Sequence, residues 1–130
     1  MQYVWILLAA AVIVLGAVLV LSSQPSTSID QQVKITLVEW KITPNPIELV
    51  AGQVRLVVFN MGVQAHALAI MSASDGKVLR QLETVPAGQV QTFLVELPRG
   101  EFLLYDALNC RDPVRNRCEK KTMVSKITVR

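Results

Sequence analysis

Seven short runs rich in β-branched residues fill most of the chain after residue 32, and they restrict it to an all-β fold. Turn sequences separate the runs, with "TPNP", "SDGK", "PAGQ" and "PRG" supplying Pro, Gly, Asn or Asp where the chain must reverse. No helical pattern of useful length lies between them. The predicted strands cover residues 33–39, 53–60, 66–72, 77–83, 89–97, 101–107 and 123–130.

Several of these runs alternate between two sets of positions. Val54, Leu56 and Val58 alternate with Arg55 and Val57, and the run over residues 123–130 alternates in the same way. Successive side chains of a strand point to opposite faces, so each such strand buries one face. Seven or eight strands of this kind in about 98 residues predict a two-sheet β-sandwich.

The N-terminal segment has a different character, because residues 3–21 contain no charged side chain. A helix rises about 1.5 Å per residue, so this segment spans nearly all of the ~30 Å hydrocarbon core of a bilayer. We therefore predict a transmembrane anchor helix over residues 1–22 that contacts the lipid bilayer through residues 3–21. A secretory signal peptide is the alternative, but Met1 and Gln2 carry no basic group and "LSSQ" is a poor cleavage site. We expect the anchor to remain uncleaved.

Residues 23–32 form a polar stretch that predicts a tether, and we expect the sandwich domain to cover residues 33–130. Lys and Arg near a span normally set its orientation, but only Lys34 and Lys41 lie within twenty residues after this span, and none lies before it. Charge alone therefore does not orient the protein. We expect a single-pass cell-membrane protein whose soluble domain lies on the extracytoplasmic side, periplasmic or external, where disulfides form.

The net charge of +3 is unevenly distributed. Residues 99–130 contain eight basic and four acidic side chains, whereas the rest of the chain contains five basic and six acidic ones. A basic C-terminal region suits an acidic protein or an anionic lipid surface, although a solvated basic surface needs no partner. We expect no nucleic-acid partner.

Motifs of enzyme chemistry are missing from the sequence. The chain contains no G-x-S-x-G, no phosphate-binding glycine loop and no Cys with a His at a known catalytic spacing. We therefore do not expect an enzyme.

Three segments in order resemble the cupredoxin family of small copper-binding β-sandwiches, namely residues 38–70, 85–105 and 123–129. The most specific match runs from Asn60 to His66 and fits the family's N-x-G-x-x-x-H, whose closing histidine is the first copper ligand. "PAGQ" and "PRGEF" fit weaker turn patterns of the family. The resemblance implies a Greek-key β-sandwich over residues 33–130.

The resemblance also implies a copper ligand set, of which only part is present. Met123 stands where the family's axial methionine precedes the last strand, but Asp106 stands at the cysteine position and Arg111 at that of the second histidine. A type 1 copper centre needs two imidazoles and a thiolate, and His66 is the only histidine in the chain. These residues cannot form a type 1 centre.

A binuclear copper site fits no better. Its loop in oxidase subunit II, which is also a cupredoxin domain, reads C-x-x-x-C-x-x-x-H-x-x-M. That frame places Asp106, Cys110, Val114 and Arg117 at four positions, and only Cys110 matches. We expect no bound cofactor, with copper as the alternative.

His66 is open to two interpretations. It is either an inert residue at the end of the sandwich, hydrogen-bonded to Asp106, or a remaining metal ligand. In the second case His66 and Met123 would bind the metal together with Asp106 or a reduced Cys110, a set that suits Cu(I).

The segment from Asp106 to Met123 is about seven residues longer than the mononuclear copper loop requires, and it holds both cysteines. Cys110 and Cys118 are either free thiols or a disulfide, and beyond a membrane anchor we predict the disulfide. The basic residues of this segment, which we expect to dock a partner, are Arg111, Arg115, Arg117, Lys120 and Lys121.

The sequence thus supports three hypotheses of different classes. The first is a membrane-anchored cupredoxin-like accessory or docking subunit of a respiratory or photosynthetic electron-transfer complex, with its type 1 copper site lost. The second is a copper-binding or copper-handling protein that uses His66, Met123 and Cys110. The third is a surface structural or adhesion module without a metal.

Overall fold

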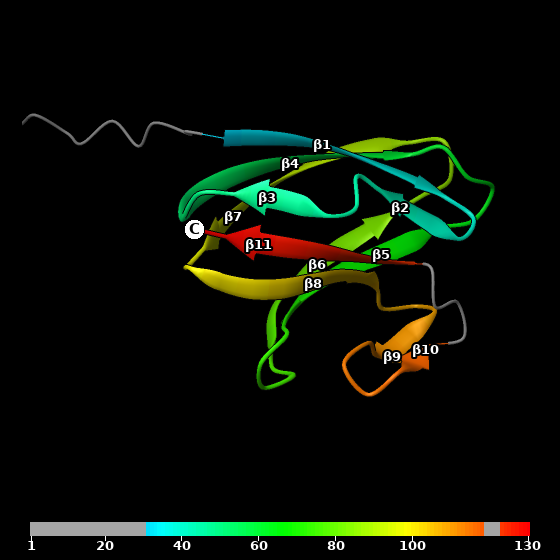
Figure 1. The fold of residues 1–130 in the computed structure, drawn as a ribbon. Coiled ribbons are helices and arrows are strands. Elements are labelled where there is room, and N and C mark those ends of the chain that lie inside the picture. The colour runs from blue at the N-terminus through cyan, green and yellow to red at the C-terminus, as the bar shows by residue number, and fades with distance from the viewer. Residues whose placement is uncertain (1–30, 119–122) are drawn as a thin grey trace, which may run out of the picture.

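The structure, a computed structural model, describes residues 31–118 and 123–130. These residues form two packed β-sheets and a separate two-stranded ribbon (Figure 1). The predicted membrane helix and most of the predicted tether lie outside the described residues, as do Lys120 and Lys121. In the described ranges, no helix is long and apolar enough to cross a bilayer.

The first sheet has four strands, and its second and third strands in spatial order run parallel to each other. The other neighbours are antiparallel. In spatial order the strands are β2 (Lys41–Thr43), β1 (Gln31–Val38), β4 (Gly52–Asn60) and β7 (Val90–Leu97).

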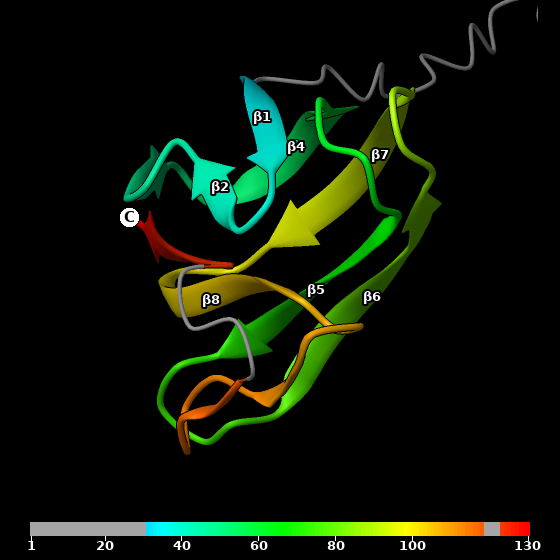
Figure 2. The same ribbon diagram turned by 90° about the vertical axis from the view of Figure 1, so that its right-hand side faces the viewer.

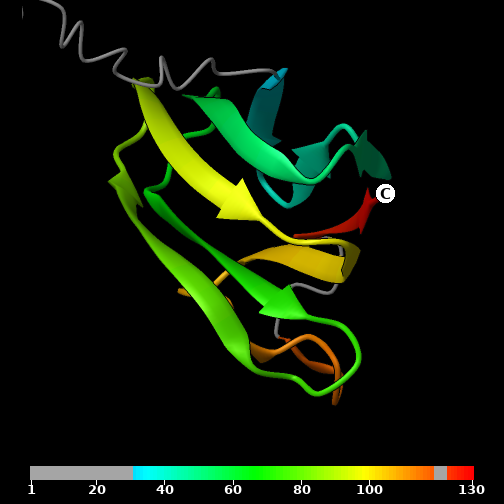
Figure 3. The same cartoon turned by 90° about the vertical axis from the view of Figure 1, so that its left-hand side faces the viewer.

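The second sheet has five strands and is antiparallel except at one edge, where its first two strands run parallel. In spatial order the strands are β3 (Ile47–Leu49), β11 (Val124–Val129), β8 (Gly100–Asp106), β5 (His66–Ser72) and β6 (Val78–Val85). Figure 3 shows the two sheets as separate layers, with β7 and β6 at the same side of the sandwich.

One buried apolar cluster fills the space between the sheets. Val54, Leu56 and Val58 of β4 are fully buried, so the predicted alternation of this strand is confirmed. β11 alternates in the same way. The largest fully buried apolar side chains are Ile35, Leu37, Ile42, Leu56, Leu68, Ile70, Leu97, Leu104, Met123 and Ile127.

All seven predicted strands are present, and the predicted two-sheet sandwich is confirmed. β1 begins at Gln31, two residues before the predicted start of the domain. The sandwich contains nine strands among the described residues rather than seven or eight, because β2 and β3 flank the "TPNP" bend. Each has only three residues, which is too short for a periodic pattern in the sequence.

A further pair of short strands, β9 (Cys110–Asp112) and β10 (Arg117–Cys118), forms a small antiparallel ribbon of its own. We call residues 110–118 the disulfide ribbon. It covers the outer face of the five-stranded sheet, where Cys110 belongs to a second buried cluster with Ala69, Met71 and Tyr105. Figure 2 shows the ribbon outside this sheet, below β5 and β8. β5 is therefore buried on both faces.

The two ends of the sandwich differ. β1, β4 and β8 finish at one end, where β5 and β11 begin, and we call this the His66 end. Gln31 and the C-terminal Arg130 lie at the other end, where each is hydrogen-bonded to the segment after β3. In Figure 1 the disulfide ribbon lies at the His66 end, away from the first residue of β1.

Candidate functional site

His66 is the first residue of β5 and is fully buried. Its Nδ1 lies 2.8 Å from Oδ2 of Asp106, which is equally buried, and its Nε2 lies 3.4 Å from Oε1 of Glu39. Trp40 packs edge-on against the ring, with the two ring centroids 6.3 Å apart. The predicted pairing of His66 with Asp106 is confirmed, and both ring nitrogens face a carboxylate.

Asp106 ends β8 and holds the surrounding backbone in place. Its Oδ1 accepts the backbone N–H of Ala67 at 3.2 Å and that of Leu108 at 3.1 Å. Its Oδ2 accepts the side-chain amide of Asn109 at 2.5 Å in addition to the His66 ring. A cysteine sulfur at this position is only a weak acceptor. Asp106 is therefore the centre of a hydrogen-bond network that connects β5, β8 and the following loop.

Glu39 reaches the other side of the ring from the turn between β1 and β2. Its Oε1 accepts the backbone N–H groups of Val63 and Gln64, both at 2.9 Å. The hydrogen bond from Gln64 is the largest cause that lowers the pKa of Glu39. Partial burial opposes this shift, and the bonds from Val63 and His66 reinforce it. Glu39 thereby connects the loop over residues 61–65 to the start of the first sheet.

The N-x-G part of the motif shapes the same loop. Asn60 is buried, and its Nδ2 donates to the carbonyls of Gln64 at 2.8 Å and Val85 at 2.9 Å, while its Oδ1 accepts the N–H of Gly62 at 3.0 Å. A side chain at Gly62 would collide with the carboxylate of Glu39. A larger residue at this position would displace the Glu39 carboxylate from its hydrogen bonds.

Met123 lies just before β11 and is fully buried in the main core. Its backbone carbonyl accepts the N–H of Asp106 at 3.3 Å. The structure thus brings His66, Asp106 and Met123 to one end of the sandwich, as the ligand frame predicts. Arg111 is different, because it is exposed on the disulfide ribbon.

The carboxylates of this site do not converge on a single point. Glu39 and Asp106 approach opposite nitrogens of the His66 ring. Over residues 31–118 and 123–130, no group of three or more His, Cys, Asp or Glu side chains is arranged to hold a metal ion. The network is built from hydrogen bonds between its own members.

The disulfide ribbon carries the remaining predicted site residues that the structure describes. Cys110 and Cys118 form a disulfide, as predicted. Burial raises the pKa of the Tyr105 hydroxyl beneath the ribbon, and the charge of Asp112 adds to this shift. The guanidinium of Arg115 pairs with Asp112 at 3.7 Å. Arg111 and Arg117 are exposed.

A family model described as a cupredoxin-like domain matches residues 11–113 of the chain. The chain belongs to the cupredoxin-like family. The resemblance drawn from the Asn60–His66 motif is therefore confirmed at the level of the family. No curated protein sequence matches this cupredoxin-like chain significantly. Proteins of the family are typically electron carriers rather than enzymes.

Solved structures with the same fold are distant in sequence. Auracyanin B is 14% identical, with a TM-score of 0.61 over 79% of this chain and 91% of that one. Dithionite-reduced auracyanin from the photosynthetic bacterium Roseiflexus castenholzii is 11% identical, with a TM-score of 0.59 over 80% and 98%. A reduced Cu(I) form of an amicyanin variant is 11% identical, with a TM-score of 0.53 over 76% and 82%. These matches show the fold alone.

The residues of this cupredoxin-like domain do not fit a type 1 copper centre. The chain contains one histidine, and its two cysteines are bonded to each other. Such a centre requires two imidazoles and a thiolate. The Asp106 carboxylate, which the sequence resemblance assigns to the cysteine position, is already engaged by four hydrogen-bond donors.

The sequence interpretation missed Glu39, Trp40 and the structural role of Asn60. Glu39 lies 27 residues before His66, and no local pattern connects the two. The only available signal was the motif itself, in which the buried Asn60 and the side-chain-free Gly62 both act within the network.

Proposed function

We propose that this cupredoxin-like protein is a membrane-anchored, extracytoplasmic accessory or docking subunit of a respiratory or photosynthetic electron-transfer complex, and that its type 1 copper site is lost. The observation that supports the proposal is the closed hydrogen-bond network around His66, at the end of the sandwich where the family resemblance implies the copper ligands. Asp106 stands in place of the thiolate, and the single imidazole is held by two carboxylates. In this proposal the sandwich serves for docking and does not transfer electrons through copper.

Exposed apolar side chains at the His66 end support a docking role. Five of them lie there at strand ends or in the adjoining loops, and Met61 and Val63 are 67% and 85% exposed. Apolar side chains gathered at one end of a domain mark contact surfaces more often than isolated ones do. The five are Val38, Met61, Val63, Val90 and Leu108.

Membrane attachment is the second part of the proposal, and the uncharged segment over residues 3–21 supports it. A disulfide in the described domain is consistent with an oxidising, extracytoplasmic compartment.

Two competing functions receive less support. Copper handling through Cys110 requires a free thiol, and Cys110 is bonded to Cys118. A structural or adhesion module would need no electron-transfer partner, and co-purification separates it from a docking subunit.

The test is extraction of the tagged full-length protein in mild detergent, followed by mass spectrometry and metal analysis. We expect haem or pigment proteins of one membrane complex to co-purify, and we expect no stoichiometric copper. A Met61→Ser/Val63→Ser variant should lose these proteins, whereas Val50→Ser, which changes an exposed valine at the opposite end, should keep them. Stoichiometric copper with an intense thiolate-to-copper absorption band would overturn the proposal. Purification of the tagged protein without any partner would overturn it as well.

A further inference from the structure

We infer that the disulfide ribbon binds an acidic segment of a protein partner, and that Arg111 and Arg117 pair with the carboxylates of this segment. The inference rests on the proposed docking function and specifies the chemistry of the partner. It concerns the ribbon, which is an insertion relative to the mononuclear copper loop.

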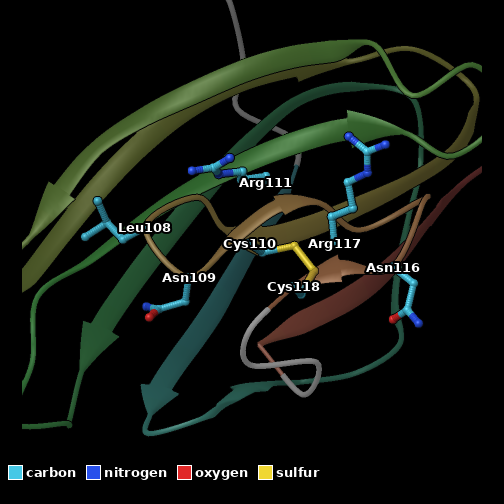
Figure 4. Close-up of a pocket in the computed structure, with 7 residues that line it drawn as sticks. All are labelled: Leu108, Asn109, Cys110, Arg111, Asn116, Arg117 and Cys118. Atoms are coloured by element: carbon cyan, nitrogen blue, oxygen red, sulfur yellow. A yellow bond between two sulfur atoms is a disulfide. The ribbon is translucent and has the colours of Figure 1, made fainter.

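The ribbon borders a hollow of about 420 Å³. Figure 4 shows its lining, with the side chains of Arg111 and Arg117 on the same side of the disulfide and those of Asn109 and Asn116 pointing the other way. Guanidinium groups donate paired hydrogen bonds that match the geometry of a carboxylate. Two of them beside one hollow form a site for neighbouring acidic side chains.

The charges of the ribbon leave these two arginines available. Asp112 is its only carboxylate, and this group accepts the backbone N–H of Arg115 at 3.1 Å and faces its guanidinium at 3.7 Å. Within the part of the chain that the structure describes, no ion pair involves Arg111 or Arg117. Their positive charges therefore remain available to a partner.

The ribbon is held firmly on the domain. Cys110 packs with Met71 and Tyr105 against the outer face of the five-stranded sheet, and the disulfide joins β9 to β10. The pairing shifts register beside the disulfide, since Cys118 opposes Cys110 and Arg117 opposes Asp112. Arg111 is thus the extra residue of a β-bulge, a feature that re-aims a side chain. The backbone that carries the two arginines is therefore ordered in advance, which lowers the conformational entropy lost on binding.

The hollow also has an apolar wall. Leu108, 59% exposed, lies among the lining residues next to Asn109. An apolar side chain of the partner would pack against Leu108 while flanking carboxylates reach the arginines. The expected ligand is a segment in which acidic residues alternate with leucine or similar residues.

The position of the ribbon favours a protein partner over lipid headgroups. β1 runs from Gln31 toward the His66 end for eight residues, or about 27 Å at the usual rise of a strand. The eight residues from 23 to 30 span at most about 29 Å when fully extended. If residues 3–21 cross the membrane, the ribbon could contact lipid only if residues 23–30 were fully extended and ran back alongside the domain toward the His66 end.

The test uses the full-length protein in non-ionic detergent and a short fluorescent peptide of alternating Glu and Leu. Fluorescence anisotropy at low ionic strength measures the affinity, and a peptide with Gln in place of Glu is the control ligand. We expect saturable binding of the Glu peptide only. Arg111→Gln/Arg117→Gln should weaken this binding at least about tenfold. Arg115→Gln should have a much smaller effect, because Arg115 is paired within the ribbon.

The matched control is Arg80→Gln/Arg99→Gln, which removes the same charge from exposed positions outside the ribbon. It should leave the affinity nearly unchanged. Equal losses in the two double variants would overturn the inference, because they would show attraction to net charge alone. Absence of saturable binding to the Glu peptide would overturn it as well.

Amide hydrogen exchange tests the lipid alternative. We expect residues 107–118 to exchange equally in micelles with and without phosphatidylserine. Protection that requires phosphatidylserine and both arginines, without peptide binding, would assign the site to lipid and overturn the inference.

Co-purification of the arginine variants separates the two proposals. A membrane complex that stays bound to Arg111→Gln/Arg117→Gln would leave the docking function intact and reject the ribbon as its contact. Stoichiometric copper with an intense thiolate-to-copper absorption band in the purified protein would reject the docking function. The peptide measurement would then stand as an independent result.

Discussion

Removing the carboxylate of Asp106 tests whether the buried network stabilises the His66 end. Asp106→Ala leaves four donors without their acceptor, namely the His66 ring, the side chain of Asn109 and the backbone N–H groups of Ala67 and Leu108. Each unsatisfied buried donor costs about 1–3 kcal/mol, but donors near the loop regain water and His66 keeps Glu39. We expect a loss of about 4 kcal/mol, the lower end of this range summed over the four donors.

Asp106→Asn separates hydrogen bonding from volume. The amide keeps an oxygen for the two backbone donors but presents its NH₂ toward His66 and Asn109. His66 must then accept at Nδ1 and carry its hydrogen on Nε2, facing Glu39, and the Asn109 amide must turn its own oxygen toward the new NH₂. We expect a smaller loss, of about 1–2 kcal/mol, together with this change of tautomer.

Thermal unfolding of the full-length protein provides the assay. Trp5→Phe in every variant leaves Trp40, which packs on His66, as the only tryptophan reporter. At about 4–8 °C per kcal/mol for a domain of this size, Asp106→Ala should lower the melting temperature by about 16–32 °C. Imidazole ¹⁵N shifts report the tautomer in Asp106→Asn. The matched control is Glu101→Ala, which removes a carboxylate from the exposed pair with Lys126 and should shift the melting temperature far less.

Two results would refute this account of the network. One is an Asp106→Ala variant that melts within a few degrees of the parent protein. The other is an Asp106→Asn variant in which the His66 ring keeps its hydrogen on Nδ1.

Three further predictions concern other residues at the His66 end and the disulfide ribbon. The pKa of Glu39 is lowered in the folded state, so its contribution to stability is complete above the ordinary value of 4.5 and is lost as the pH falls through the folded pKa. Glu39→Gln should therefore flatten this acidic part of the stability profile in pH-dependent urea unfolding, and an unchanged profile would contradict the shift. Gly62→Ala should destabilise the parent protein, because the new methyl group collides with the Glu39 carboxylate, and it should destabilise the Glu39→Ala variant much less. Additive effects in this double-mutant cycle would contradict the contact. Cys110→Ser/Cys118→Ser should lower the unfolding free energy by about 2.6 kcal/mol, from the entropy of a nine-residue loop, while far-UV circular dichroism still reports the folded sandwich. Loss of the sandwich signal would mean that the ribbon is part of the main folding unit.

The sandwich could be predicted from the sequence alone. Alternation in strands such as β4 reports directly which side chains face the core, because successive residues of a strand point to opposite faces. The motif over residues 60–66 and the spacing to Met123 also identified the end at which the site lies. The pairing of His66 with Asp106 followed from the copper-ligand positions of the resemblance, since each residue lies at a strand end at the same end of the sandwich.

The surroundings of His66 and the segment that covers β5 could not be predicted from the sequence and became visible only in the folded chain. Glu39 enters the network from a turn in the other sheet, and a contact across the sandwich leaves no periodic trace in the sequence. The nearly continuous apolar run "HALAIMS" has no alternation, because the core covers one face of β5 and the disulfide ribbon covers the other. Short-range patterns report the faces of single strands, whereas the identity of the covering segment depends on chain reversals far away in the sequence.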